Sequence, residues 1–295
     1  MRYDSTTGLP ADVIQEIVAR VWDVAQGRGL DFSRHKVKLY QQVVICLILL
    51  RQNTSQMVIA DMVGVSQPTI CRIWRRITGI LETVLVLTSG GLTEAIQQGH
   101  LLLVDGSFVP TGNRPASGQA AANYSGKRKV QCLNIQVAAT DRGDLVADSD
   151  PFPGARHDAG VIQKCGWSDL LAEVGACWVA DTAYTATTAV TPVKKKPSQP
   201  RADREKQFNR TIAGIRASVE HCIAHLKNWK MLANGYRGRL KELPAIIRIV
   251  TQLELLRTQR EKNLVNNAHI VQWAMSSGVS LRRVQHAYTE ISSRS

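Results

Sequence analysis

Three carboxylates stand in sequence positions from which they could hold metal ions. Two short apolar runs, residues 101–104 and 177–180, each lead into an aspartate, Asp105 and Asp181. An ionised carboxylate at the mouth of a buried strand is costly unless a cation or hydrogen bonds compensate it. The third candidate, Glu220, lies beside the apolar stripe of a long expected helix, from which it can reach the edge of a sheet.

Two cations share the helix face of Glu220. Arg216 lies one turn before it, and Lys227, seven residues after it, returns to the same side of the helix. Three converging carboxylates are what two-metal phosphoryl transfer requires, with two Mg²⁺ ions ~3.5–4 Å apart bridging one phosphate. The alternative is that both aspartates cap turns and that Glu220 forms an i,i+4 salt bridge with Arg216. For the three carboxylates together, this alternative is the weaker one.

Several ordered sequence blocks carry a family resemblance. They are Leu103-Val104-Asp105-Gly106-Ser107, Tyr124-Ser125-Gly126-Lys127, Pro153-Gly154-Ala155-Arg156-His157-Asp158, Ala180-Asp181-Thr182-Ala183-Tyr184, Phe208-Asn209 and Arg216-x3-Glu220-x6-Lys227. With these blocks, residues 101–257 resemble the catalytic domain of insertion-sequence and Harbinger-type DDE transposases, which has a ribonuclease H-like fold. The resemblance implies that Asp105, Asp181 and Glu220 are the catalytic, metal-binding triad for two Mg²⁺ ions, with Mn²⁺ as a substitute. It also implies that Arg216 and Lys227 contact DNA.

The same resemblance leaves three residues of the signature open. His157 and Asp158 match it as accessory residues, without a firm role; alternatively, Asp158 simply caps the helix that follows. Ala213 stands where the signature often has a tyrosine, so no role of that tyrosine transfers to this chain.

The resemblance implies a two-step reaction on double-stranded DNA. Water attacks a phosphodiester at the transposon end and releases a 3′-hydroxyl, which then attacks target DNA at the same metal pair. No covalent enzyme intermediate forms. Because the two DNA ends must be paired, a homo-oligomer on DNA is expected.

The N-terminal region has the pattern of a helix-turn-helix, Ala60-x3-Gly64-Val65-Ser66-x3-Ile70. The small alanine permits close helix packing, the glycine makes the turn, and the second helix would enter the major groove. This nominates Gln67, Thr69 and Arg72 for base contacts and Arg75 or Arg76, preferably Arg76, for phosphate. The alternative is an ordinary helical hairpin.

The chain is expected to form an all-α helix-turn-helix domain (residues 1–95), an α/β ribonuclease H-like catalytic domain (98–258) and a basic tail (259–295). The catalytic domain would be a mixed sheet flanked by helices at 159–174 and 203–232. In its central hairpin, strand 130–139 carries Asn134 and Gln136 on a polar face. The tail repeats the helix-turn-helix spacing as Ala274-x3-Gly278-Val279-Ser280-x3-Val284, which suggests an accessory helical unit that contacts DNA. The alternative is an oligomerisation arm or a loosely packed tail.

Charge supports a polyanionic partner. The 295 residues include 37 Lys and Arg against 24 Asp and Glu, a net charge of +13, and residues 193–295 hold 20 basic and 7 acidic residues. The longest apolar run, residues 43–50, is far short of the ~20 residues that span a membrane, so a cytoplasmic protein without a membrane partner is expected. The rival to a transposase is a DNA-binding protein whose transposase domain is inactive or domesticated.

Overall fold

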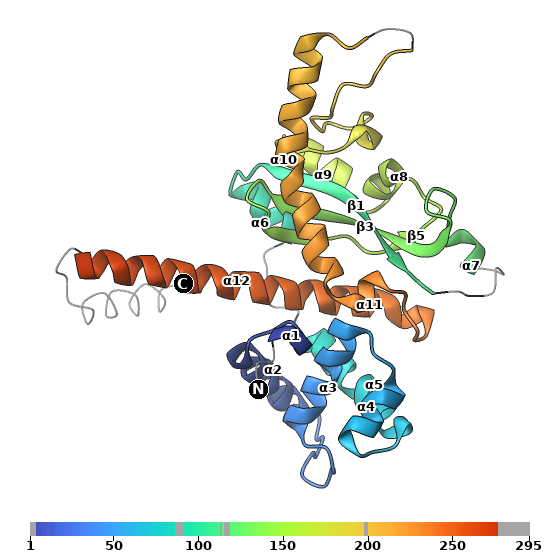
Figure 1. Cartoon of the computed structure of the whole chain (residues 1–295), viewed down its shortest axis with the longest axis vertical. Coiled ribbons are helices and arrows are strands. Elements are labelled where there is room, and N and C mark those ends of the chain that lie inside the picture. The colour runs from blue at the N-terminus through green and yellow to red at the C-terminus, as the bar shows by residue number, and fades with distance from the viewer. Residues whose placement is uncertain (1–3, 86–90, 113, 115–118, 198–199, 277–295) are drawn as a thin grey trace. The chain divides into compact units, whose positions relative to one another are not determined.

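The computed structural model describes residues 4–85, 91–112, 114, 119–197 and 200–276 (Figure 1). The chain separates into a large unit, residues 1–255, and a small one, residues 256–295. Helix α12 (Leu243–Ser276) crosses from one unit into the other. Most of the second helix-turn-helix pattern, from residue 277 onward, lies outside the described residues.

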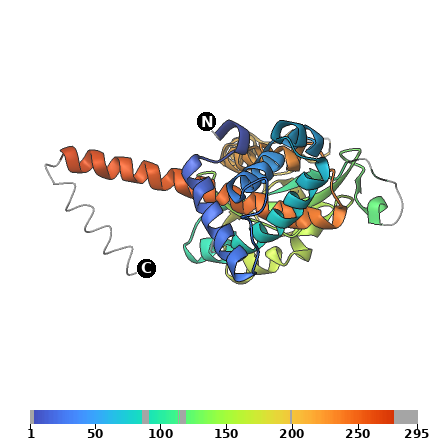
Figure 2. The same ribbon diagram turned by 90° about the horizontal axis from the view of Figure 1, so that it is seen from below.

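The chain begins with helices that pack around a common apolar core (Figures 1 and 2). They are α1 (Asp4–Thr7), α2 (Ala11–Gly27), α3 (Leu39–Gln52), α4 (Gln56–Val63) and α5 (Gln67–Val84). Helix α3 is buried on most of its sides because its sequence is almost continuously apolar, and the buried stripe of α5 includes Ile70, Ile73, Trp74 and Ile77.

A tight turn joins α4 to α5. Gly64 ends α4 in the left-handed region, at φ +70°, where a side chain would be strained. Ala60 and Ile70 are buried on either side of this turn. Ser66 precedes α5, but its hydroxyl bonds the Thr69 hydroxyl (3.0 Å) and not a backbone N–H of the helix.

The following segment forms a mixed sheet of strand order β2-β3-β1-β6, with β4 and β5 also paired to β3. The strands are β1 (Leu102–Pro110), β2 (Tyr124–Ser125), β3 (Val130–Thr140), β4 (Leu145–Asp148), β5 (Phe152–Pro153) and β6 (Trp178–Val179). Strand β1 is antiparallel to β3 and parallel to β6. The prediction that the first strand ends at Asp105 is wrong. The long strand β3 offers β1 hydrogen-bond partners as far as Pro110, so Asp105 lies in mid-strand.

Helices cover both faces of the sheet, so β3 is buried on both faces and not on one. The helices of this segment are α6 (Gly91–Gln97), α7 (Gln119–Ala122), α8 (Asp158–Lys164), α9 (Trp167–Glu173), α10 (Asp203–Lys227) and α11 (Lys230–Ala233), with 3₁₀ turns η1 (Thr182–Tyr184) and η2 (Leu240–Glu242). Of these, α6, α8, α10 and α11 contact strands of the sheet. Asn134 and Gln136, expected on a polar face, are fully buried, because α8 and α10 both pack against β3.

Two helices differ in extent from the sequence expectation. The helix expected over 159–174 is split into α8 and α9 at Gly166, whose φ is +77°. The long helix ends at Lys227, and α11 restarts at Lys230. Helix α6 packs through Leu92 and Ala95 with the sheet core. In the part of the chain that the structure describes, no helix combines the length and the apolar character needed to cross a membrane.

Candidate catalytic groove

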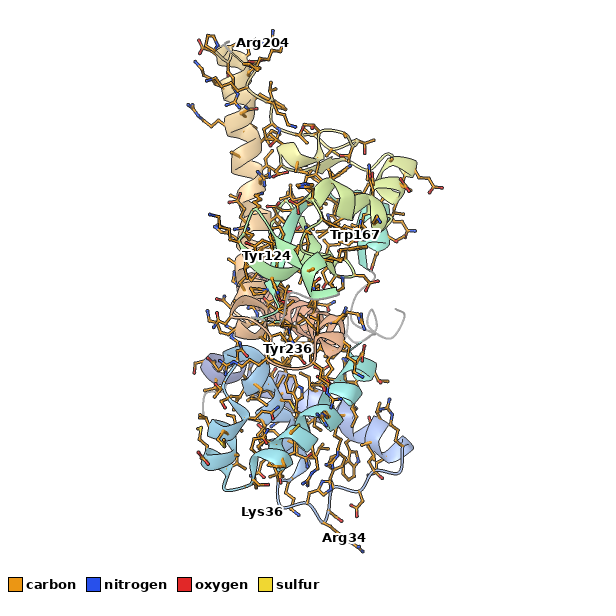
Figure 3. The ribbon with its side chains drawn as sticks, turned by 90° about the vertical axis from the view of Figure 1, so that its right-hand side faces the viewer. Arg34, Lys36, Tyr124, Trp167, Arg204 and Tyr236 are labelled. Atoms are coloured by element: carbon orange, nitrogen blue, oxygen red, sulfur yellow. The ribbon has the colours of Figure 1, made fainter. Side chains whose placement is uncertain are left out.

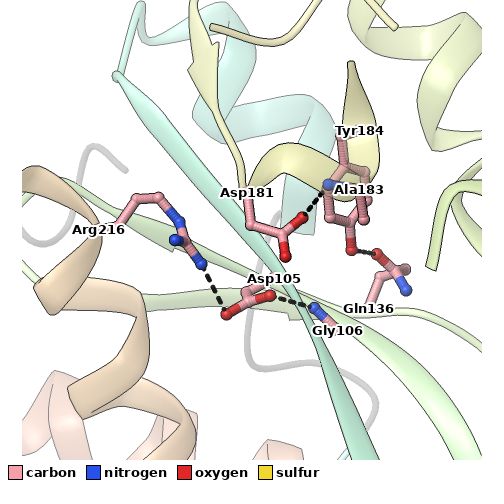
Figure 4. Close-up of polar contacts among 7 residues, drawn as sticks. All are labelled: Asp105, Gly106, Gln136, Asp181, Ala183, Tyr184 and Arg216. Atoms are coloured by element: carbon pink, nitrogen blue, oxygen red, sulfur yellow. Dashed lines mark hydrogen bonds and ion pairs between the residues drawn. The ribbon is translucent and has the colours of Figure 1, made fainter. Parts of the chain in front are cut away.

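The pairing of β1 with β6 brings Asp105 and Asp181 side by side. Leu103 lies opposite Val179 in this parallel pair, and each aspartate lies two residues further along its own segment. Figure 4 shows the two carboxylates next to each other. Asp181 is fixed as the cap of η1, where its Oδ1 accepts a hydrogen bond from the Ala183 N–H at 2.7 Å.

Asp105 is a partly buried carboxylate with one nearby cation. Arg216 reaches from α10 so that its Nη2 lies 3.2 Å from Asp105 Oδ2, and the Gly106 N–H donates to Asp105 Oδ1 at 2.8 Å. The pKa of Asp105 is nevertheless raised: burial is the main cause, and the carboxylates of Asp181 and Asp158 add to it, against the lowering by Arg216. A carboxylate whose ionised form is disfavoured by burial and by neighbouring carboxylates is stabilised by a further cation.

Glu220 and Lys227 line an open groove together with Asp105. The groove has a volume of about 400 Å³, and its other lining residues include Phe108, Arg128 and Cys132. Glu220 itself is exposed on α10, and Arg216 forms its ion pair with Asp105 and not with Glu220. Among the described residues, no three His, Cys, Asp or Glu side chains are close enough together to hold one ion.

The donor set nonetheless fits a divalent metal. Asp105 and Asp181 supply adjacent carboxylate oxygens, which Mg²⁺ and Mn²⁺ prefer as ligands. Glu220 lines the groove together with Asp105, whereas Asp181 is not among the described residues that line it. Of the predicted triad, Asp105 and Asp181 are thus the two carboxylates that lie side by side.

Lys227 is tied into the fold. Its ammonium donates to the Phe108 carbonyl of β1 and to the Leu232 carbonyl of α11, the latter at 3.0 Å. Burial lowers its pKa to about 8. An ammonium has three donors, so one N–H remains for a ligand in the groove that Lys227 lines.

Asp158 lies against β1 on the face opposite the Asp105 side chain. Its Oδ1 accepts a hydrogen bond from Asn134 Nδ2 at 2.8 Å, and a Cβ added to Gly106 would lie 2.4 Å from the same oxygen. Asp158 is the first residue of α8 and not its cap; the cap position belongs to His157, which is exposed and makes no side-chain cap bond.

Residues that the sequence reasoning did not assign to the site form a polar layer beneath it. The buried Tyr184 hydroxyl donates to Gln136 Oε1 (Figure 4). The pKa of Tyr184 is raised far above its ordinary value by burial and by Asp158, Asp105 and Asp181, so its hydroxyl stays protonated. The signal in the sequence was the pair of amides, Asn134 and Gln136, on a strand that is otherwise apolar.

The residues predicted to read DNA differ in how free their side chains are. Gln67 Nε2 donates to Gln56 Oε1 at 2.8 Å, and the Thr69 hydroxyl bonds Ser66. Arg72 and Arg75 are exposed. The Arg76 guanidinium is turned inward: Nη1 lies 3.1 Å from His35 Nδ1 and 3.3 Å from Gln42 Oε1, and the group stacks over Phe32. Of the two arginines, Arg75 is therefore the better exposed.

Comparisons with known proteins identify a family and two named relatives. Residues 104–254 match a family described as DDE superfamily endonuclease. The chain is 26% identical, over 70% of its own length and 76% of the other, to a Microchaete diplosiphon protein named as a transposase for insertion sequence element IS702. It is 30% identical, over 45% of its length and 49% of the other, to a Streptomyces albus G protein named as a transposase for element IS112. No solved structure matches the chain.

Proposed function

Because the chain belongs to the DDE superfamily of endonucleases and is a DDE-type transposase, we propose that it binds the ends of a DNA element and carries out metal-dependent cleavage and strand transfer. The proposed site is formed by Asp105, Asp181 and Glu220. The observation that carries this proposal is the parallel register of β1 and β6, which sets Asp105 beside Asp181.

The side chains of the candidate site have separate tasks in this proposal. Asp105 and Asp181 would hold Mg²⁺, or Mn²⁺ in its place, and Glu220 would complete the ligand set from α10. Ions held there would supply activation of the attacking oxygen and stabilisation of the leaving oxygen in an in-line displacement. Arg216 reduces the repulsion between the aspartates, and Lys227 offers its remaining donor to a DNA phosphate. The neutral Tyr184 hydroxyl, bonded to Gln136, supports the segment that carries Asp181.

The strand order supports a ribonuclease H-like catalytic domain, since a central strand pairs antiparallel on one side and parallel on the other. The left-handed Gly64 between two helices, with Ala60 and Ile70 buried, supports a helix-turn-helix. In this proposal Gln67, Thr69 and Arg72 contact bases, and Arg75 or Arg76 contacts phosphate. The protein would act as a homo-oligomer because two element ends are joined.

One observation favours the rival function, a DNA-binding protein with an inactive or domesticated catalytic domain. Arg216 forms an ion pair with Asp105, one of the two carboxylates that a metal ion would need. The two functions differ in whether DNA is cut.

The test uses duplex DNA taken from both flanks of the native gene. Cleavage is assayed with Mg²⁺, with Mn²⁺ and with EDTA, for the wild type and for Asp181→Asn. The matched control is Asp169→Asn, an exposed carboxylate on α9. Metal-dependent cuts at defined positions, lost in Asp181→Asn and kept in Asp169→Asn, support the transposase. Undiminished cutting by Asp181→Asn removes Asp181 from the site, and binding without cutting under any metal favours the rival.

A further inference from the structure

A short turn after α11, residues 234–239, is fixed by hydrogen bonds to three other parts of the chain. The Tyr236 N–H donates to the Pro110 carbonyl at the end of β1 (3.1 Å). Asn53, at the end of α3, donates from Nδ2 to the Gly235 carbonyl (3.1 Å). Arg114 donates from Nη2 to the carbonyls of Tyr236 (3.0 Å) and Gly238 (2.8 Å). The backbone of this turn is therefore held on several sides.

The glycines of the turn are required by its shape. Gly235 has φ +88°, and a Cβ on Gly238 would lie 2.3 Å from the Tyr236 hydroxyl oxygen. The Tyr236 side chain is buried, and its hydroxyl donates to Glu242 Oε2 at 3.1 Å. In Figure 3, Tyr236 lies where this segment meets the N-terminal helices. A rigid turn loses little conformational entropy when it binds a ligand.

This turn presents two arginines to solvent. Arg237 and Arg239 flank Gly238, are both exposed, and form no ion pair within the described part of the chain. Together with the exposed Arg75 of α5 they line an open groove of about 460 Å³. The one carboxylate among its described lining residues is Glu242, which already accepts the Tyr236 hydroxyl. The groove is therefore cationic on two walls that come from distant parts of the sequence.

The position of the groove on α5 indicates its ligand. Arg72, nominated for base contacts, lies one turn before Arg75 on the same helix, and both side chains are exposed. A duplex read by the N-terminal turns of α5 would carry its phosphates toward Arg75. Unpaired guanidiniums in an open groove suit phosphate oxygens, which they bind in pairs of parallel hydrogen bonds.

We propose that Arg75, Arg237 and Arg239 form a second DNA site, separate from the catalytic groove, that binds the sugar-phosphate backbone of the duplex contacted by α5. This inference rests on the proposed function, since it takes DNA as the substrate. The site binds DNA independently of its base sequence. The turn at residues 234–239 also connects the groove beside α5 to the end of β1, the strand that carries Asp105.

The test measures the salt dependence of DNA binding by the full-length protein. The probe is a fluorescein-labelled 30-bp duplex of arbitrary sequence, titrated between 50 and 200 mM salt. Each phosphate contact adds about 0.9 to the steepness of log K against log salt, which amounts to at most about eightfold in affinity at 100 mM. For Arg237→Gln with Arg239→Gln we expect the slope to fall by about 1.8 and affinity to fall roughly 10- to 60-fold. Arg75→Gln should lower the slope by about 0.9.

Two controls separate charge in the groove from charge in general and from misfolding. Arg142→Gln with Lys164→Gln removes the same net charge at exposed positions outside the groove and should leave the slope near that of the wild type. Arg237→Lys with Arg239→Lys keeps the charge and should keep the slope. The inference is overturned if the Gln pair behaves like the outside pair, or if the Lys pair loses the slope as the Gln pair does. If the wild type cuts flank DNA, but the variant with Arg237→Gln and Arg239→Gln has the same slope as the control with Arg142→Gln and Lys164→Gln, this inference alone is refuted. A wild type that binds no DNA refutes the proposed function as well.

Discussion

Gly106→Ala tests whether Asp158 is packed against the strand that carries Asp105. Gly106 has no positive φ, so alanine fits the strand conformation, and this change alone stabilises a protein by about 0.4–1 kcal/mol through the unfolded chain. In this chain, however, the added Cβ would lie 2.4 Å from Asp158 Oδ1 and 2.7 Å from its Cγ. Asp158 must therefore move, and its bond to Asn134 is lost.

The change in the free energy of unfolding follows from the cost of displacing Asp158 and from the opposing gain through the unfolded chain. Overpacking costs about 1–3 kcal/mol, and a hydrogen bond to a charged group contributes about 1.5 kcal/mol or more. Against the gain from the unfolded chain, we expect Gly106→Ala to lower the free energy of unfolding by about 2 kcal/mol. In an Asp158→Ala background the clash is absent, so the same change should be neutral or slightly stabilising. The coupling energy of the double-mutant cycle is then about 2–3 kcal/mol.

Urea unfolding of the four proteins measures this cycle. The matched control is Gly214→Ala on α10, where an added Cβ meets no atom within 4 Å. It should stabilise by up to about 1 kcal/mol, as expected for a helix interior. Equal costs of Gly106→Ala with and without Asp158 would refute the packing argument, because the cost could not then arise from that contact.

Two further predictions concern the sheet and the reading helix. Asp148 has a carboxylate oxygen, Oδ2, that is buried without a hydrogen-bond partner among the described residues, and burial raises its pKa to about 7. Since the folded-state pKa lies above the unfolded one, wild-type stability should fall as pH rises from about 4 to about 7. Asp148→Asn should remove up to about 4 kcal/mol of that fall, measured by urea unfolding at both ends of the window; an unchanged pH profile would contradict this. Thr69→Ala with Arg72→Ala should erase the preference for the element's own ends while general DNA binding survives, measured by competition between specific and arbitrary duplexes; a retained preference would mean that bases are read elsewhere.

The sequence was sufficient to predict elements with strong periodicity, but tertiary pairing decided their ends. The helix pattern of α2 and α5 and the apolar run of α3 are determined locally, so their positions could be predicted to within a few residues. The far end of β1 could not, because residues 106–110 form strand only through their pairing with β3. The burial of Asn134 and Gln136 likewise depends on helices that begin 22 or more residues away.

The candidate site, too, could be predicted from the sequence only in part. Spacing on one helix predicted that Glu220, Arg216 and Lys227 share a face, and Glu220 and Lys227 do line one groove. Spacing could not predict the partners of the cations. Arg216 pairs with Asp105 of β1, and Lys227 donates to the carbonyls of Phe108 and Leu232. The first two contacts join residues more than 100 positions apart, and the third lies beyond the end of α10.

The placement of Asp181 depends on β6, a strand of only two residues. Strand β6 pairs with β1 through only two residue pairs, Leu102 with Trp178 and Leu103 with Val179. Neighbouring contacts reinforce this register: Val190 exchanges backbone hydrogen bonds with Trp178 and Ala180, and the Trp178 ring meets Tyr184 edge to face. A one-residue slip of β6 would turn Asp181 away from Asp105, because neighbouring side chains on a strand point to opposite faces. The apolar packing around Trp178 and Tyr184 therefore acts on the site through register, although neither side chain supplies an oxygen to the groove.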